Sequence, residues 1–574
     1  MKDLLRYLKE YKTECVLAPL FKMLEAIFEL FVPLVVASII DKGIGGGDRA
    51  YIVKCCGIMI TLGIVGLISA VSAQYMAAKA AVGFATGLRS DLFKHIMSLS
   101  HKNIDESGTS TMITRMTADV NQAQTGVNMF LRLFLRSPFI VFGAMIMAFT
   151  IDANAALIFV AVIAVLFIVV GLTMRFNIPM LKKVQGRLDK ITLLTRENLI
   201  GARVIRAFTM EERERNDFSG INDDLLRQQR LAGHLSALLN PMTFVLINAA
   251  VIILIHIGAV KVEAGILTKG EVVALYNYMS QILVELIKLA NLIVLLNKAI
   301  ASGDRINDIF GIVPDIDNGH PADRAAEADK EKDDGAFICF EHVSLRYSET
   351  GDEALSDIDL CVNRGETVGI IGGTGSGKSS VVNLIPRFYD ATEGRVVIDG
   401  VDVKEQELSV LRSRIGMVPQ KAVLFKGTIA ENLRWGNENA KYEELAEAVR
   451  LAVCSEVVEA KGGLDGMIEQ NGRNLSGGQR QRLTIARALV RKPEILILDD
   501  SASALDFATD LKLRRNIAQT DGKMTVFIVS QRTSAVQNAD KIMVLDDGCV
   551  VGLGTHEELL RDCPVYKEIY DSNT

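Results

Sequence analysis

A run rich in glycine lies between a predicted strand and a predicted helix. Its members are Gly372, Gly373, Thr374, Gly375, Ser376, Gly377, Lys378 and Ser379, and Ser380 opens the helix. Glycines let backbone N–H groups converge on phosphate oxygens, and the helix N-terminus adds partial positive charge. Lys378 can reach the outer phosphates, and Ser379 can ligate Mg²⁺. The run therefore predicts a site for a nucleoside triphosphate with Mg²⁺.

An acidic pair follows a second predicted strand. Residues 495–498 are all aliphatic, and Asp499 and Asp500 come directly after them. A carboxylate at the end of a buried strand can reach the Mg²⁺ of a nucleotide held by a neighbouring phosphate loop. Taken alone, Asp499 fits equally well as a surface acid at the end of an ordinary strand. Together with the phosphate loop, it is predicted to be a metal ligand.

A third motif suggests a family. Residues 475–479 are Leu475, Ser476, Gly477, Gly478 and Gln479, and they lie between the phosphate loop and the acidic pair. This pentapeptide resembles the signature of ABC transporter ATPase domains. The resemblance implies that Ser476, Gly478 and Gln479 act on the nucleotide bound by a second subunit. It also implies that Tyr347 stacks on adenine, that Gln420 lies near Mg²⁺, and that residues 503–506 form the D-loop.

Two positions depart from the family pattern. The family usually has glutamate after the acidic-motif aspartate and histidine about thirty residues later, whereas this chain has Asp500 and Gln531. The shorter Asp500 side chain would hold its carboxylate roughly 1–1.5 Å further back, and misplacement on that scale can cost about a hundredfold in rate. Gln531 can donate a hydrogen bond but cannot carry positive charge. We expect a site that binds ATP and hydrolyses it slowly, although tolerated variants at a working site are the alternative.

The first half of the chain is too apolar for a soluble enzyme. Hydrophobic residues make up 49% of the 574 positions, the mean hydropathy is +0.26, and the apolar residues concentrate before residue 300. A chain of this length should contain several domains. Each of six apolar stretches could cross a hydrocarbon layer of about 30 Å. They are residues 16–40, 52–75, 130–150, 155–174, 238–260 and 272–296.

The connections between these stretches predict their orientation. Lysine and arginine concentrate in the long connections after the second and fourth stretches, whereas the other connections are short. Basic residues near a membrane mark its cytoplasmic side. We therefore expect a multi-pass protein of the cell (plasma) membrane with both termini and the ATPase domain in the cytoplasm. Residues 1–8 have no cleavable-signal pattern and predict a short amphipathic helix at the cytoplasmic surface.

Six spans before one ATPase domain resemble the half-transporters of the ABC exporter fold. The predicted fold is therefore an α-helical polytopic membrane domain over residues 1–312, an acidic linker over 313–335, and an α/β P-loop ABC ATPase domain over 336–574. Residues 105–119 and 197–208 look like the two cytoplasmic coupling helices. With Asp500, Gln531 and an intact signature, the chain is most similar to the degenerate-site subunit of heterodimeric bacterial multidrug exporters.

The resemblance implies ATP-driven export of small amphipathic compounds together with a second half-transporter subunit. The intact signature would complete the partner's competent site. A homodimeric lipid, peptide or metal-chelate transporter and a regulatory or sensor subunit remain alternatives, and the cargo stays open. We expect the lipid bilayer and an amphipathic small molecule as partners, and no nucleic acid.

Charged side chains and cysteines in the chain raise two further expectations. Charge inside a membrane span is costly and often functional. The candidates are Glu25, Glu29, His256, Glu285 and Lys288. Snorkelling or internal pairing is the alternative, and acids lining a cavity would favour amphipathic cations. The eight cysteines have no metal-type spacing, so free thiols are expected.

Overall fold

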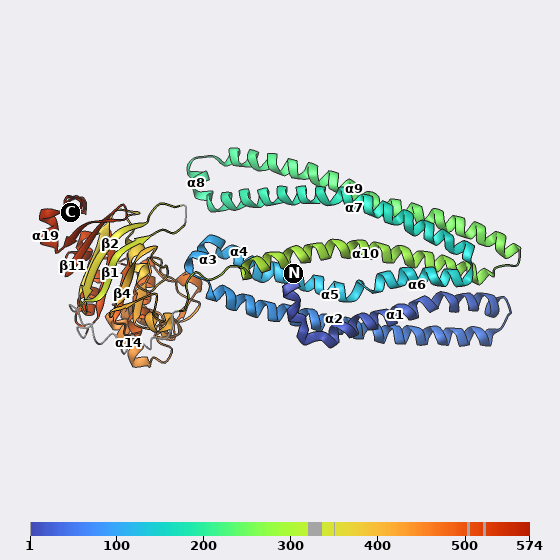
Figure 1. Ribbon diagram of the computed structural model, residues 1–574, viewed down its shortest axis with the longest axis horizontal. Coiled ribbons are helices and arrows are strands. Elements are labelled where there is room, and N and C mark those ends of the chain that lie inside the picture. Colours follow the sequence, from blue (N-terminus) through green and yellow to red (C-terminus); the bar gives the residue numbers. More distant parts are fainter. Residues whose placement is uncertain (1, 319–335, 349–350, 502–504, 521–523, 574) are drawn as a thin grey trace. The chain divides into compact units, whose positions relative to one another are not determined.

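The computed structural model describes residues 2–318, 336–348, 351–501, 505–520 and 524–573, which form two compact units (Figure 1). The first unit comprises Met1–Met97 and Ser110–Gly311, and the second comprises Ser98–Thr109 and Ile312–Thr574. Most of the predicted acidic linker, residues 319–335, lies outside the described residues. The second unit is thus drawn from two separate parts of the sequence.

The first unit is built from helices, most of its residues lying in long ones. In chain order they are η1 (Lys2–Tyr11), α1 (Lys12–Ser38), η2 (Ile39–Ile44), α2 (Arg49–Ser98), α4 (Thr109–Thr114), η3 (Arg115–Asp119), α5 (Val120–Leu133), α6 (Arg136–Ile151), α7 (Ala153–Ile200), α8 (Ala202–Ala207), α9 (Glu211–Glu263) and α10 (Lys269–Phe310). Six helical runs in the described part of the chain are long and apolar enough to cross a membrane, and each contains one predicted span.

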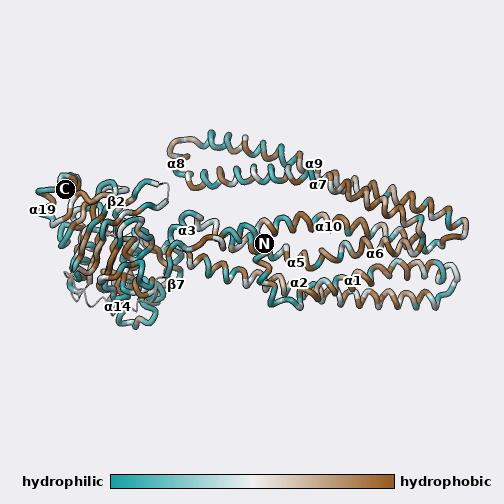
Figure 2. The backbone as a smooth tube through the Cα atoms, in the orientation of Figure 1, coloured by the Kyte–Doolittle hydropathy of each residue, from teal (hydrophilic) through white to brown (hydrophobic). Residues whose placement is uncertain are grey.

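These runs are longer than the spans predicted for them. They contain 42 to 53 residues, which at 1.5 Å per residue is about twice the thickness of a hydrocarbon layer. The basic connections expected after the second and fourth spans are therefore largely helical extensions. Figure 2 shows the change along the paired helices α7 and α9, which are hydrophobic at one end and hydrophilic toward α8. The second predicted coupling segment contains α8, in the turn between them.

The first predicted coupling segment, residues 105–119, covers parts of two helical elements. The short helix is α3 (His101–Ser107), whereas Thr109–Asp119 already belongs to the next long helical run. The Ser100 side chain caps α3 by accepting a hydrogen bond from the Asn103 backbone N–H, and Gly108 ends the helix with a φ of 75°. Capping by serine and termination at a left-handed glycine fix these bounds locally. Residues 105–119 thus include the end of α3 and the start of the next helical run, and their role as a coupling segment stays a prediction.

The second unit is built on two main sheets. An antiparallel sheet has the order β2-β1-β4-β5, and a mostly parallel sheet has the order β12-β11-β3-β10-β9-β6. The strands of the first are β1 (Ala336–Leu345), β2 (Leu355–Asn363), β4 (Glu393–Ile398) and β5 (Val401–Asp402). Those of the second are β3 (Thr367–Gly372), β6 (Ile415–Val418), β9 (Ile495–Asp499), β10 (Thr525–Ser530), β11 (Lys541–Asp546) and β12 (Cys549–Gly554). β3, β9 and β10 are almost entirely buried, as their aliphatic sequences predict.

Helices and a small third sheet complete this unit. The strands β7 (Gly427–Thr428) and β8 (Met467–Ile468) pair with each other. The helices are α11 (Lys378–Leu384), α12 (Leu408–Ser413), α13 (Ile429–Arg434), α14 (Tyr442–Leu451), α15 (Ser455–Ala460), η6 (Gln470–Gly472), α16 (Gly477–Val490), α17 (Phe507–Ala518), α18 (Thr533–Val536), α19 (His556–Asp562) and α20 (Pro564–Asn573). The alternation of strands and helices confirms the predicted α/β class.

One pair of cysteines contradicts the expectation of free thiols. Cys339 on β1 lies directly opposite Cys361 on β2, with their Cα atoms 4.3 Å apart, and the two form a disulfide. Antiparallel register brings directly opposite side chains into contact, and the sequence spacing of 22 residues gave no sign of it. The described cysteines other than this pair are free thiols.

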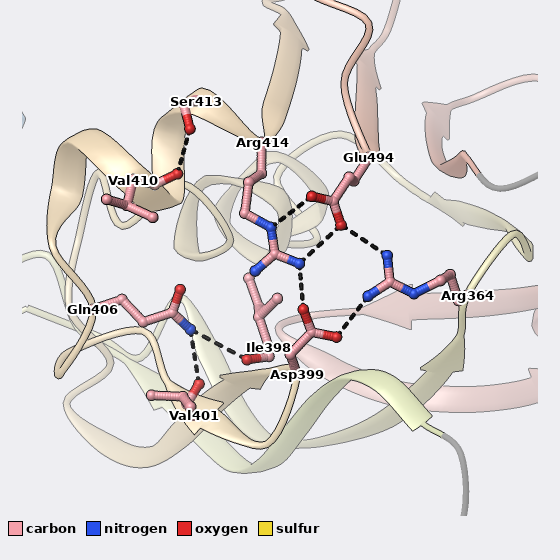
Figure 3. Close-up of polar contacts among 9 residues, drawn as sticks. All are labelled: Arg364, Ile398, Asp399, Val401, Gln406, Val410, Ser413, Arg414 and Glu494. Carbon is pink, nitrogen blue, oxygen red and sulfur yellow. Dashed lines mark hydrogen bonds and ion pairs between the residues drawn. The ribbon is translucent and has the colours of Figure 1, made fainter. Parts of the chain in front are cut away.

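Four charged side chains of the second unit form a closed ring of ion pairs (Figure 3). Arg364 donates to Glu494 and to Asp399, each at 2.7 Å, and Arg414 contacts the same two carboxylates. The guanidinium group of Arg364 also lies 3.9 Å from the ring centroid of Phe337. The hydrogen bond from Arg414 is the main reason why the pKa of Glu494 is lowered, although partial burial opposes it. The ring joins the ends of β2 and β4 to the segment before β9.

We expect Glu494→Gln to destabilise the second unit by about 1 kcal/mol at pH 7, the upper end for partly exposed ion pairs. Because the folded-state pKa of Glu494 is lowered, its contribution is complete above the unfolded pKa of about 4.3 and is lost as the pH falls through the folded value. Calorimetric melting of the full chain at pH 7 and at acidic pH measures this. The exposed pair Glu447–Arg450 supplies the control, Glu447→Gln. An equal shift at both pH values would contradict the prediction.

Candidate nucleotide-binding site

The carboxyl ends of four neighbouring parallel strands form the site. In the sheet, β10 lies between β3 and β9, and β6 follows β9. The phosphate loop follows β3, Gln531 follows β10, Asp499 ends β9, and Gln420 lies two residues beyond β6. Ligands of open α/β sheets bind beyond the carboxyl ends of the strands. The fold thus brings together residues that are up to 159 positions apart in the chain.

The phosphate loop depends on glycine at its end. Gly377 has a φ of 91°, and a Cβ atom there would lie 2.7 Å from the carbonyl oxygen of Ala354. Only glycine avoids both the backbone strain and this clash. α11 begins at the next residue, Lys378, whose Nζ donates to the carbonyl oxygens of Gly372 and Gly373 at 3.0 and 2.5 Å. Burial lowers the pKa of Lys378, while the carboxylates of Asp500 and Asp499 oppose this change.

Two oxygen donors lie together at the predicted metal position. The Ser379 hydroxyl donates to Oδ1 of Asp499 at 2.9 Å. Burial raises the pKa of Asp499, and the neighbouring Asp500 carboxylate raises it further, against the hydrogen bond from Ser379 and the charge of Lys378. A buried carboxylate whose charged form is disfavoured gains from a cation, and Mg²⁺ prefers such oxygen ligands. The residues present therefore fit Mg²⁺ held between Ser379 and Asp499.

The two unusual residues lie at this same edge. Asp500 has a φ of 45°, and its backbone N–H donates to the carbonyl oxygen of Val529 on β10 at 3.0 Å. Its Oδ2 accepts a hydrogen bond from Nε2 of Gln420 at 3.3 Å. Gln531 follows the last residue of β10 and is exposed. Asp500 and Gln420, which sequence reasoning treated separately, thus contact each other directly.

The predicted adenine platform contacts a residue that the sequence did not single out. The Tyr347 hydroxyl lies 2.8 Å from Oγ of Ser380, and its ring meets the Tyr389 ring edge-on with centroids 4.9 Å apart. Both tyrosines line a cavity of about 330 Å³. The Tyr389 hydroxyl donates to Asp105 on α3 at 3.0 Å, and burial, reinforced by that carboxylate, raises the pKa of Tyr389. In the sequence, the role of Tyr389 is indicated only by its place in an aromatic run shortly after α11, residues 387–389.

We expect Tyr347→Ala to weaken ATP binding by roughly tenfold or more, because stacking of a base on an aromatic ring contributes about 1–3 kcal/mol. Binding of a non-hydrolysable ATP analogue to the full chain measures this. Tyr347→Phe keeps the ring but loses the contact with Ser380, so it should bind almost normally. Equal losses in the two variants would show that the hydroxyl, not the ring, supports binding.

The signature residues begin a different helix. Ser476 precedes α16, and its hydroxyl accepts a hydrogen bond from the Gln479 backbone N–H at 3.3 Å. The Gln479 side chain accepts from the Ser476 backbone N–H at 2.9 Å, which completes a capping box. Gly477 and Gly478 occupy the first turn, where backbone N–H groups and the helix dipole favour an anion. Residues 503 and 504 of the predicted D-loop lie outside the described residues.

Comparisons with known proteins agree with this organisation. Residues 15–286 match the ABC transporter transmembrane region family, and residues 355–503 match the ABC transporter family. An ABC transporter ATP-binding protein of Mycobacterium tuberculosis (strain ATCC 25618 / H37Rv) is 35% identical over 99% of this chain and 97% of its own length. YfiB, an ABC transporter ATP-binding protein of Bacillus subtilis, is also 35% identical, over 100% of this chain and 98% of its own length.

A more distant relative has a name that states a cargo. The ATP-dependent lipid A-core flippase of Yersinia pestis is 27% identical over 97% of this chain and 95% of its own length. Both matched regions lie in the predicted order, with the membrane region before the ATPase domain. The chain belongs to the ABC transporter family, as a half-transporter in which six apolar helical runs precede one ATPase domain.

Proposed function

We propose that this chain is the degenerate-site half of a heterodimeric ABC exporter for small amphipathic compounds. The observation that carries the proposal is the pair Asp500 and Gln531 beside an otherwise complete nucleotide site. Asp500 is one methylene shorter than the glutamate usual in the family, and it already accepts a hydrogen bond from Gln420. The chain would bind ATP strongly, hydrolyse it slowly, and lend its intact signature to a competent site on the partner.

Each predicted residue has a task in this proposal. Tyr347 would stack on adenine, and the loop from Gly372 to Ser380 would hold the phosphates. Ser379, Asp499 and Gln420 would hold Mg²⁺, which neutralises phosphate charge when bound. The first turn of α16, from Ser476 to Gln479, would approach the phosphates bound by the partner. The chain would lie in the cell membrane with its termini and ATPase domain in the cytoplasm.

A drug-like or lipid-like cargo has support among the relatives. A Bacillus subtilis protein provisionally named as a multidrug export ATP-binding/permease protein, YgaD, is 32% identical over 99% of this chain and 98% of its own length. The flippase of Yersinia pestis is named for a lipid. Both kinds of cargo are amphipathic. The name of the flippase favours a lipid transporter as the second candidate function.

ATPase assays on the full chain, alone and co-purified with a candidate second half-transporter, test the proposal. We expect almost no phosphate release from the chain alone and vigorous release from the pair. Replacing the partner's catalytic glutamate with glutamine should abolish that release, whereas Asp500→Asn in this chain should change it little. Vigorous hydrolysis by the chain alone would overturn the degenerate-site assignment and favour a homodimer.

A further inference from the structure

Six charged side chains from three helices meet within the first unit. Arg136 on α6 donates to Glu285 on α10 at 2.5 Å and to Glu29 on α1 at 2.7 Å. Glu285 also accepts from Lys288 at 2.8 Å. The members of this charge cluster are Lys22, Glu25, Glu29, Arg136, Glu285 and Lys288. Three are cationic and three are anionic, so the charge cluster is neutral as a whole.

Glu29, Arg136 and Glu285 of the charge cluster lie at similar distances along their apolar helices. The backbone N–H of Gly270 donates to Asp41 at 2.8 Å, so the end of α1–η2 lies beside the start of α10. From these ends, Glu29 and Glu285 are each about fifteen residues, or roughly 22–24 Å, along their helices. Arg136 is equally far from the end of α6 at Ile151. If a hydrocarbon layer of about 30 Å begins at these helix ends, all three charged groups lie inside it, toward its far side.

Beside the charge cluster is a cavity of about 370 Å³ that is lined by both polar and apolar side chains. Its polar lining is Glu29, Asn277, Ser280, Gln281, Glu285 and Lys288. The Arg136 and Glu285 side chains are 8% and 3% exposed, whereas those of Glu29 and Lys288 are both 42% exposed. Two opposite charges thus face the cavity, held in place by a buried pair. Oε1 of Gln281 is buried with no hydrogen-bond partner among the described residues.

We infer that this cavity binds a headgroup carrying both an ammonium group and an anionic oxygen. A ligand with net charge would add an uncompensated charge to a neutral cluster in a low-dielectric region, which is costly. A zwitterion keeps the site neutral, because Glu29 takes its cationic end and Lys288 its anionic end. Val32, Val36 and Ile140, which also line the cavity, accommodate the adjoining apolar part.

This inference rests on the proposed export function, because it names the class of its cargo. It also changes the expectation drawn from the sequence. Glu29 and Glu285 alone would favour an amphipathic cation, but Arg136 and Lys288 balance their charge. A bilayer lipid with a phosphocholine-type headgroup and a soluble amphipathic zwitterion share the required chemistry.

Three amphiphiles with the same dodecyl tail but different heads test the inference. The three compounds carry a phosphocholine, a trimethylammonium or a phosphate head. Each is titrated into the full chain in a maltoside detergent without ATP, and its binding affinity is measured. We expect the phosphocholine compound to bind about tenfold more tightly than the other two. Lys288→Gln should weaken the phosphocholine and phosphate compounds and spare the trimethylammonium compound, and Glu29→Gln should do the reverse. Glu263→Gln, at the exposed end of α9, is the matched control and should change nothing.

Competition distinguishes the two sources of a zwitterion. If phosphatidylcholine in nanodiscs displaces the probe, the ligand is a membrane lipid. If soluble glycerophosphocholine, whose phosphodiester head is a neutral zwitterion, does so, the ligand is a soluble solute. Equal affinities for the three heads, or variants that shift all three together, would overturn the inference. Because no ATP is present, that result would leave the asymmetry of the ATP sites untouched.

Discussion

Restoring glutamate and histidine at the two replaced positions, as Asp500→Glu with Gln531→His, is expected to raise ATP hydrolysis by this chain by about a hundredfold. The added methylene moves the carboxylate roughly 1–1.5 Å further out. The imidazole returns a group able to carry positive charge beside the transferred phosphate. Each single change should yield less than the pair, because aligning the water and stabilising charge act on the same transition state.

Phosphate release from the full chain, reconstituted alone, measures this effect. Two copies would place the intact signature of each over the phosphate loop of the other, so both restored sites would be complete. Cross-linking establishes that the copies associate. Asp500→Asn with Gln531→His is the control, since it lacks a carboxylate to orient water. A cross-linked double variant that stays inactive would show that some other feature of the site limits hydrolysis.

Replacing Arg136 with methionine is expected to destabilise the first unit by about 3–5 kcal/mol. Arg136 is the cation that three carboxylates share, those of Glu285 and Glu29 and, at 3.9 Å, Glu25. Removing it leaves like charges facing one another in a region of low dielectric, where Glu285 is almost fully buried. Calorimetric melting of the full chain in detergent should show a midpoint lowered by roughly 5–15 °C.

A double variant isolates the cause of that loss. Arg136→Met with Glu285→Met removes both members of the buried pair, so it should regain much of the lost stability. Arg215→Met is the matched control, because Arg215 forms an exposed ion pair with Glu212 and should matter by less than about 0.5 kcal/mol. If the single and double Arg136 variants melt alike, lost packing rather than unpaired charge accounts for the effect.

The ATPase fold and its phosphate loop could be predicted because their signals are local. Glycine positions, Lys378 and the strand before them fix the loop within a few residues, and the aliphatic run before Asp499 indicates a buried strand. The family pattern then placed Tyr347 and Gln420. The contact between Gln420 and Asp500 depends on β6 lying next to β9 in the sheet. The spacing of the two residues in the sequence does not reveal that strand order.

Features that depend on long-range register were missed. The sequence suggests a local pair of Glu285 and Lys288, but the contact of Glu285 with Arg136 joins residues 149 positions apart. Cys339 and Cys361 meet only because β1 and β2 pair in one register. The bounds of α3 are set by local capping at Ser100 and termination at Gly108, which the family-like spacing of residues 105–119 does not contain. These features depend on tertiary contacts or on local capping, neither of which follows from hydrophobic patterns or family motifs.

The helix α3 has a consequence for biosynthesis. It folds with the second unit, where Asp105 accepts a hydrogen bond from Tyr389 and His101 packs 4.5 Å from the Phe388 ring. Asp105 leaves the ribosome 284 residues before Tyr389, which is roughly 15–60 s at about 5–20 residues per second. During that time four further membrane helices are made and inserted. The ATPase domain therefore completes its fold around a segment synthesised long before the rest of it.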